Sequence, residues 1–438
     1  MTEVKETRLL TRRLREFPED SWTIERAIAD GAYENLKKAL AMTPDAVQAE
    51  VKSSGLRGRG GAGFPAATKW SFLPADSFPR YLVVNGDEGE PSTFKDHMLV
   101  EGDPHQIVEG ILIAAYAIGC HQSFVYLRGE FGLGYDRLVG AIEDARTKGF
   151  VGTNIAGSGF DCDIVMHRAA GAYICGEETA LLESLEGERG MPRLRPPFPA
   201  VAGLYAKPTV VNNIETLSTV PHIVQMGGEE YAKLGVNKST GTRIFSVSGH
   251  VKKPGNYEVE LGMTFRDLLY GLAGGIREDR AIKFIIPGGA SSQWMPPTDE
   301  ALDLPLDMDA IGPAFGAMLG SGAVMVFDET TDPISVAWRL AKFFAHESCG
   351  KCTPCREGTG WIEKVLYRMS HGEGRPEDLD MLLDVGDNIS PGLNAPFSQT
   401  TICPLGPSAV SAVVSLNKYF RAEVETRCGA GSVERALA

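Results

Sequence analysis

Four cysteines near the end of the chain have the spacing of an iron–sulfur ligand set. Cys349, Cys352 and Cys355 form an unbroken C-x2-C-x2-C run, and Cys403 is followed directly by Pro404. Three thiolates two residues apart can wrap one face of a cubane, and a remote Cys-Pro can supply the thiolate for the fourth iron. The pattern predicts one [4Fe–4S] cluster held by these four side chains.

Two other uses of the same cysteines are compatible with the residues alone. Structural Zn²⁺ also takes four thiolates, although such sites usually combine two separated C-x2–4-C pairs. Cys352 and Cys355 also match a thioredoxin-like dithiol, which would need a helix start beside a βαβ unit, and the additional Cys349 argues against it. The remaining cysteines have no partner at ligand spacing: Cys120, Cys162 and Cys428 are interpreted as packing thiols, and Cys175 as either core or part of a binding site.

A glycine-rich loop with nearby cations could approach a phosphate or a flat ring. The run from Gly58 to Gly63 matches G-x-G-x-x-G, but it follows a helical pattern, so the strand that gives this motif its usual meaning is missing. Arg57, Arg59 and Lys69 lie close by, and glycine N–H groups can approach a ligand because no Cβ intervenes. The alternative is a flexible surface loop.

Carboxylates and amides follow the predicted strands. The segment from Asn85 to Pro91 comes directly after the apolar strand Tyr81–Val84, at the end where open α/β sheets bind ligands. Its side chains could accept hydrogen bonds from ribityl or ribose hydroxyls, whereas a solvated turn would explain them equally, and a calcium loop would need more oxygen ligands. The segment from Tyr173 to Glu178 opens a helix, where the dipole favours anions or where the two glutamates simply cap the helix.

The elements that must position these residues follow from the spacing of apolar side chains. Strands alternate with helices and predict parallel βαβ units in this order: Tyr81–Val84, Pro104–Ile118, Ser123–Leu127, Tyr135–Thr147 and Cys162–His167. Two helical stretches, Ser21–Leu40 and Thr43–Ser53, precede them.

Short strands around one helix, Thr264–Leu272, predict a small α+β domain between Thr242 and Asp328. Four later helices predict a bundle with the cysteines on its connections: Ile334–His346, Gly358–Met369, Glu377–Val385 and Ser408–Phe420.

Length and charge narrow the class of protein. A chain of 438 residues exceeds one hydrophobic core, so two to four domains are expected. The net charge of −14 argues against a nucleic-acid partner. The longest apolar stretch, Ile111 to Cys120, is about half the ~20 residues that cross a bilayer, so we expect no direct membrane insertion. Met1 to Arg15 contains no secretory signal, so the chain is expected to stay inside the cell.

Taken in order, the motifs resemble the family of NADH-binding, FMN-containing subunits of respiratory complex I, the 51 kDa or F type. Six segments carry the resemblance over nearly the whole chain: Ser54–Ala66 with Lys69 to Ser71, Val84–Ser92, Tyr173–Glu188, Pro196–Val201, Val211–Ser218 and Glu347–Thr359. The resemblance implies an α/β fold with a modified Rossmann-like parallel-sheet domain, then a β-grasp (ubiquitin-like) domain and a C-terminal four-helix bundle carrying the cluster. The expected domains are 1–78 (helical arm and glycine-rich loop), 79–238 (Rossmann-like, FMN and NADH), 239–330 (β-grasp, SLBB-like) and 331–438 (bundle).

The resemblance also assigns roles to individual residues. FMN would be held by residues of five loops: Gly58, Arg59, Gly60, Lys69, Asn85, Asp87, Glu88, Tyr173, Gly176, Glu177, Glu178, Asn212, Asn213 and Thr216. NADH would stack between the flavin and three rings, Phe64, Phe72 and Phe198. Glu90 and Glu178 would lie near the nicotinamide end, where their charge could destabilise bound NAD⁺ or tune the flavin. Arg195 stands where the family has a familiar lysine, so its contact with the dinucleotide would have a different geometry.

The implied activity is hydride transfer from NADH to FMN, followed by single-electron steps to the [4Fe–4S] cluster and onward to quinone. The implied partners are a thioredoxin-like [2Fe–2S] subunit and a larger iron–sulfur subunit, with quinone reached only through the complex. The implied location is the cytoplasmic face of the bacterial inner membrane, as a peripheral part of a membrane complex. Two alternatives remain: the diaphorase subunit of a soluble NAD-linked hydrogenase or formate dehydrogenase, and a non-catalytic, metal-stapled scaffold.

Overall fold

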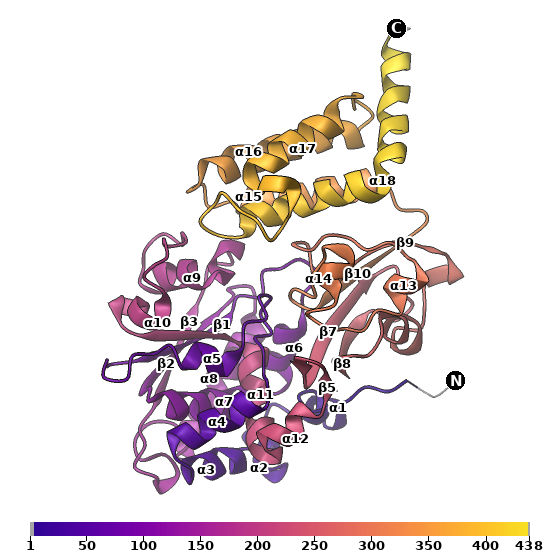
Figure 1. The fold of residues 1–438 in the computed structure, drawn as a ribbon. Coiled ribbons are helices and arrows are strands. Elements are labelled where there is room, and N and C mark those ends of the chain that lie inside the picture. Colours follow the sequence, from indigo (N-terminus) through magenta and orange to yellow (C-terminus); the bar gives the residue numbers. More distant parts are fainter. Residues whose placement is uncertain (1–3, 437–438) are drawn as a thin grey trace.

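Alternating buried side chains build a four-stranded parallel sheet, which is the centre of the larger part of the molecule (Figure 1). The structure is a computed structural model and describes residues 4–436. In sheet order the strands are β3 (Asp163–Arg168), β2 (Gln122–Leu127), β1 (Tyr81–Gly86) and β4 (Thr209–Asn213). Leu82 and Val84 of β1 enter one core and Val83 enters another, so the sheet is buried on both faces, as parallel sheets usually are.

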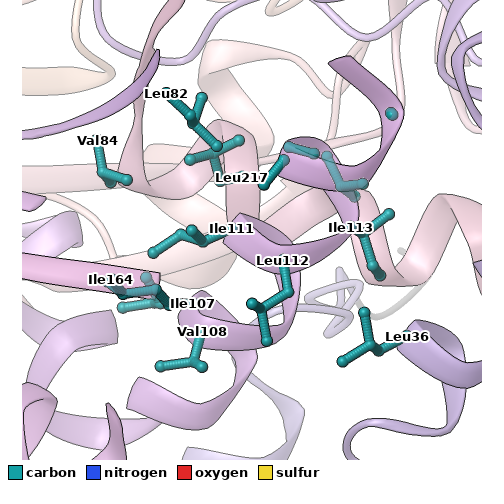
Figure 2. Close-up of a cluster of buried hydrophobic side chains, with 14 of the residues drawn as sticks. Leu36, Leu82, Val84, Ile107, Val108, Ile111, Leu112, Ile113, Ile164 and Leu217 are labelled. Atoms are coloured by element: carbon teal, nitrogen blue, oxygen red, sulfur yellow. The ribbon is translucent and has the colours of Figure 1, made fainter. Parts of the chain in front are cut away.

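Helix α7 (Pro104–Ile118) fills the centre of the first core. It is apolar on nearly every side, and Asp103 caps its start while Gly119, at φ 67°, ends it. Figure 2 shows Ile107, Ile111 and neighbouring α7 side chains directed at residues of the sheet, of α11 and of the N-terminal arm. A helix that is apolar all round must be buried, and the predicted bounds of this helix are confirmed.

The elements around α7 complete this face of the sheet. They are α6 (Lys95–Gly102), α8 (Gly132–Thr147), α11 (Ile214–Met226) and α12 (Gly228–Ala232), with the arm helices α1 (Arg12–Glu16), α2 (Ile24–Ala29), α3 (Glu34–Leu40), α4 (Pro44–Ser53) and α5 (Ala66–Trp70). The predicted stretch Ser21–Leu40 is not one helix, because Gly31 and Tyr33 have positive φ and separate α2 from α3. The arm and the sheet share one core, which is continuous across the predicted boundary after residue 78.

A second, mixed sheet has its own core. In sheet order its strands are β8 (Gly255–Glu260), β7 (Thr242–Gly249), β10 (Ala323–Asp328) and β9 (Ile282–Ile286). The central pair β7 and β10 is parallel and the outer pairs are antiparallel, which is a β-grasp arrangement. The predicted helix Thr264–Leu272 is present as a continuous helical stretch over residues 265–272, most of which is the π-helical segment η4 (Asp267–Leu272). Smaller elements here are β5 (Gly235–Val236), β6 (Ser239–Thr240), α13 (Asp299–Leu302) and α14 (Ile311–Phe315).

The C-terminal helices form the predicted bundle, which lies across both sheet domains in Figure 1. Its helices are α15 (Pro333–Glu347), α16 (Thr353–Ser370), α17 (Asp378–Ile389) and α18 (Leu405–Ala436). The bundle core is continuous with the second face of the parallel sheet and with α9 (Glu178–Leu185). This continuity holds the cysteine segment close to the loops of the first sheet. Within residues 4–436, no helix combines the length and apolar character needed to span a bilayer.

A close crossing of two helices in the first core gives a stability test. A Cβ on Gly110 of α7 would lie 2.1 Å from the carbonyl oxygen of Leu217 on α11. Gly110→Ala should therefore lower the free energy of unfolding by at least about 2 kcal/mol, because neither helix backbone can yield. Gly140 of α8 is the matched control: it is exposed with no atom within 4 Å of a built Cβ, so Gly140→Ala should raise stability by up to about 1 kcal/mol. Urea unfolding followed by circular dichroism measures both, and equal midpoints for the two variants would contradict the proposed crossing.

Candidate functional site

The chain reverses its direction of travel across the parallel sheet at β1. Strands β2 and β3 extend the sheet on one side of β1, and β4 lies on the other side. Ligands of open α/β proteins bind at such a switch point, beyond the carboxyl ends of the strands. The polar segments predicted from the sequence follow β1, β3 and β4, so the fold gathers them at this edge.

Direct contacts join these loops. Asn85, at the end of β1, donates from Nδ2 to the carbonyl oxygen of Gly176 at 2.8 Å. Lys69 contacts Glu178 with an Nζ to Oε2 distance of 2.6 Å. The glycine-rich loop approaches α11 closely, because the Arg59 amide donates to Thr216 Oγ1 at 2.9 Å.

Close packing also explains a glycine in this loop. A Cβ on Gly60 would lie only 3.1 Å from Cβ of Asn213. Because glycine has no Cβ, the loop backbone at Gly60 can approach the end of β4. Together these contacts join several loops between residues 58 and 216 into one site.

Asp87 is the clearest sign that a polar ligand belongs at this site. Its side chain is 1% exposed, yet neither carboxylate oxygen has a hydrogen-bond partner among residues 4–436. Burial raises the pKa of Asp87 to about 7. A buried carboxylate without partners is costly, and hydroxyl groups of a ligand would supply the missing donors. The ribityl chain of FMN is a ligand of this kind, so Asp87 fits it.

Glu90 sits where three parts of the chain meet. Its Oε2 accepts from the Tyr173 hydroxyl at 2.6 Å and from Ser291 Oγ at 3.0 Å, and its Oε1 accepts from the Ser291 amide at 2.7 Å. Burial raises the pKa of Glu90. Ser291 belongs to the loop after β9, so the β-grasp domain holds Glu90, one of the two carboxylates expected near the nicotinamide, in a fixed orientation.

Some predicted site residues point elsewhere or serve the scaffold. Arg59 is 1% exposed, and its Nη2 donates to the carbonyl oxygens of Thr240 and Thr242, while its Nε and Nη1 are buried without a hydrogen-bond partner among residues 4–436. The Glu88 carboxylate accepts from the Asp96 and His97 amides at the start of α6.

Three more predicted site residues make hydrogen bonds within the protein, and two of them cap helices. Glu177 caps α9 by accepting from the amides of Thr179 and Ala180, which was the alternative interpretation of that loop. Asn213 caps α11 by accepting from the Glu215 amide, and Asn212 accepts from the Trp70 indole at 2.8 Å.

The three rings predicted to stack on NADH are exposed. Phe64 and Phe72 are 47% and 54% exposed, and their centroids lie 6.0 Å apart. Phe198 is 56% exposed, at the start of α10 (Pro199–Ala202). Arg195 reaches Glu178, with Nη1 3.4 Å from Oε1. Large apolar rings left in solvent are typical of surfaces that bind a ligand or partner.

The four predicted ligand cysteines line one pocket. Cys349, Cys352, Cys355 and Cys403 surround it together with residues that include Ile174, Pro192 and Lys351. Burial raises the pKa of the Cys403 thiol to about 12, so a bound cation is needed to keep that sulfur ionised.

Two polar groups already contact the sulfurs. The Ile402 amide donates to Cys352 Sγ at 3.3 Å, and the Ser348 hydroxyl lies 3.3 Å from Cys355 Sγ. Within the described part of the chain, no three His, Cys, Asp or Glu side chains converge on a single ion. The donor set and the polar groups around the sulfurs fit an iron–sulfur cluster.

Comparison with known proteins agrees with this geometry. Residues 51–222 match the Nuo51 FMN-binding domain, residues 335–427 the NADH-ubiquinone oxidoreductase-F iron-sulfur binding region, and residues 244–291 the SLBB domain. The F subunit of NADH-quinone oxidoreductase from Mycobacterium tuberculosis is 52% identical, over 92% of this chain and 90% of the relative. The corresponding protein of Streptomyces coelicolor is also 52% identical, over 93% and 88%.

This chain belongs to the family of NADH-quinone oxidoreductase F subunits. The fold is shared more widely, because a chain of an NAD⁺-reducing [NiFe]-hydrogenase superimposes with a TM-score of 0.80 at 39% identity. That match covers 90% of this chain, which spans 65% of the length of the hydrogenase chain. The predicted α/β architecture and complex I family are confirmed.

Two residues that contact the site loops were not among the site residues predicted from the sequence. Ser291 is 7% exposed and binds Glu90 through both its amide and its hydroxyl. Glu347 accepts from the Tyr173 amide at 3.0 Å. Glu347 is close to Cys349 in the sequence, but no local pattern indicates that it binds Tyr173, which lies 174 residues earlier.

Removal of one thiol tests the ligand set. Cys403→Ser should lower the iron content from about four per chain, because a serine hydroxyl is a poor replacement for thiolate. Cys428→Ser is the matched control, since Cys428 is a buried thiol outside the pocket and the variant should keep its iron. Iron and acid-labile sulfide per chain are the measurements. A full complement of iron in Cys403→Ser would remove Cys403 from the set.

Proposed function

We propose that this chain oxidises NADH at an FMN bound on the carboxyl edge of the parallel sheet and delivers the electrons singly to a [4Fe–4S] cluster held by Cys349, Cys352, Cys355 and Cys403. The observation that carries the proposal is the turn η2 (Tyr173–Gly176), which contacts both sites. Gly176 accepts from Asn85 in the flavin loops, and Ile174 lines the cysteine pocket. Both proposed redox sites would therefore include residues of this turn.

Bound FMN converts a hydride into single electrons, which an iron–sulfur cluster can carry. The side chains of this chain bind and orient rather than exchange protons. Asp87 would accept hydrogen bonds from ribityl hydroxyls, and Asn85 and Gly176 hold the wall beside it. Lys69 is paired with Glu178, so its charge is already balanced before any phosphate or nucleotide arrives.

The nucleotide is proposed to lie over the exposed face of the site. Phe64, Phe72 and Phe198 provide apolar surfaces on which adenine can stack, worth about 1–3 kcal/mol per stacked base in nucleic-acid platforms. Glu90 would place a carboxyl group near the reacting rings, whereas Glu178 is already paired with Lys69 and Arg195. Tyr173 and Ser291 hold Glu90 in place, which suits alignment of the nicotinamide and flavin rings at near-attack distance.

As a member of this family, the chain assembles with other subunits of complex I. We propose a thioredoxin-like [2Fe–2S] subunit and a larger iron–sulfur subunit as the direct neighbours, with quinone reached through them. We also propose that the chain is a peripheral part of the complex on the cytoplasmic face of the bacterial inner membrane. The subunits recovered with the chain after mild extraction test these neighbours and separate complex I from a soluble hydrogenase.

The decisive test of the function is the visible spectrum of the anaerobic protein before and after NADH, with flavin and iron quantified on the same sample. Bleaching of a bound flavin together with about four irons per chain supports the proposal. Bound zinc without flavin or iron would leave a metal-stapled scaffold as the function.

The pKa of Asp87 predicts how FMN binding depends on pH. Free Asp87 is protonated below about pH 7, and hydrogen bonds from ribityl hydroxyls favour its ionised form. FMN binding should therefore release a proton, and affinity should rise with pH by up to about tenfold per pH unit as pH approaches 7 from below. Fluorescence titration of FMN-depleted protein measures this dependence.

Asp87→Asn provides the reference for that titration. FMN phosphate itself titrates near pH 6, with a second pKa of about 6, so some pH dependence will remain in every variant. The additional slope should vanish in Asp87→Asn, which cannot ionise. Identical pH profiles for the wild type and Asp87→Asn would show that Asp87 does not contact FMN.

A further inference from the structure

The turn η2 is the part of the chain that touches both proposed redox sites. A Cβ on Gly176 would lie 3.1 Å from Asp87 Oδ2, so the turn packs directly on the flavin loop. Ile174, two residues earlier, lines the pocket of the four cysteines. The turn therefore connects the flavin loop to the cysteine pocket.

Tyr173, the first residue of the turn, is fixed at both ends. Its hydroxyl donates to Glu90 at 2.6 Å, and its amide donates to Glu347 Oε2 at 3.0 Å. Its ring packs edge-on against Phe343 and Phe344 of α15, with centroids at 5.0 and 6.2 Å. The ring contacts restrict sideways movement, and the two hydrogen bonds fix the turn along the line from the flavin loops to the bundle.

Glu347 connects the end of α15 to the turn η2. It is the last residue of α15 and stands two positions before Cys349, and its side chain is 18% exposed. We propose that Glu347 is a positioning residue that sets the distance between flavin and cluster by binding the Tyr173 amide. The inference rests on the proposed function, because it concerns electron transfer between those two groups.

The role depends on the reach of the side chain and not on its charge. A neutral glutamine has the same length and can accept from the Tyr173 amide through its carbonyl oxygen. Aspartate keeps the charge, but it is one methylene shorter and loses contact unless the helix end or the turn moves. Because electron transfer slows steeply as redox centres separate, the two variants should behave differently.

The test compares Glu347→Asp with Glu347→Gln in the full chain carrying FMN and the cluster. Stopped-flow absorbance with NADH follows flavin bleaching, and freeze-quench EPR follows appearance of the reduced cluster. Glu363→Asp is the matched control, because Glu363 accepts from the Trp338 indole inside the bundle, away from the turn. FMN and iron contents are measured for every variant.

The expected result is a normal rate of flavin bleaching in all variants and a delayed cluster signal in Glu347→Asp alone. Equal timing in Glu347→Asp and wild type would overturn the inference while leaving the proposed function intact. A delay in Glu347→Gln but not in Glu347→Asp would also overturn it, by showing that charge matters instead of reach. Failure of the wild type to bleach with NADH would count against the proposed function itself. If Glu347→Asp loses iron or FMN, Glu347→Gln carries the test. A delayed cluster signal in Glu347→Gln that retains FMN and iron would then refute the proposal.

Discussion

Burial of the parallel sheet on both faces is the constraint on which the rest of the structure depends. Neither face of the parallel sheet is open to water. One face packs on α7 and α11, and the other packs in the same core as α9 and the bundle. Polar groups are then confined to the strand ends, where the loops after β1, β3 and β4 meet. The same packing that excludes water from the second face places the cysteine segment beside those loops. The proximity of the two sites is thus a consequence of one shared core.

The buried charges mark where the two sheet domains are joined. Lys95 lies 2.9 Å from Asp96 and 2.8 Å from Glu215, and all three are almost fully buried. Glu215 also accepts from the Ile244 amide of β7, which links α11 to the β-grasp sheet. Such a cluster adds little net stability, but removal of Lys95 would leave two buried carboxylates without their cation. It therefore restricts how the domains can be arranged, as Glu90 and Ser291 do at the site.

Local signals in the sequence predicted much of this structure. The pattern of apolar side chains predicted helix α7 at its observed bounds, and the structure shows that Asp103 caps its start and Gly119 ends it. The cysteine pocket followed from a spacing of two residues. Arg59 shows the limit of such reasoning: its neighbours favour a role in anion binding, yet its side chain enters the interface with residues 240–242. The direction of a side chain in a loop depends on partners far along the chain, and no local pattern contains them.

Arg59, in the glycine-rich loop, and Lys69, in the helix α5 that follows it, have different surroundings. One nitrogen of Arg59, Nη2, donates to two carbonyl oxygens, which ties the buried side chain to residues 240–242. Lys69 is partly exposed and paired with Glu178, so it can exchange one anionic partner for another at modest cost. The glycines between them let the loop approach α11 as closely as the Arg59 amide requires. The loop therefore approaches α11 through its backbone, and of these two cations Lys69 is the one whose side chain is partly open to solvent.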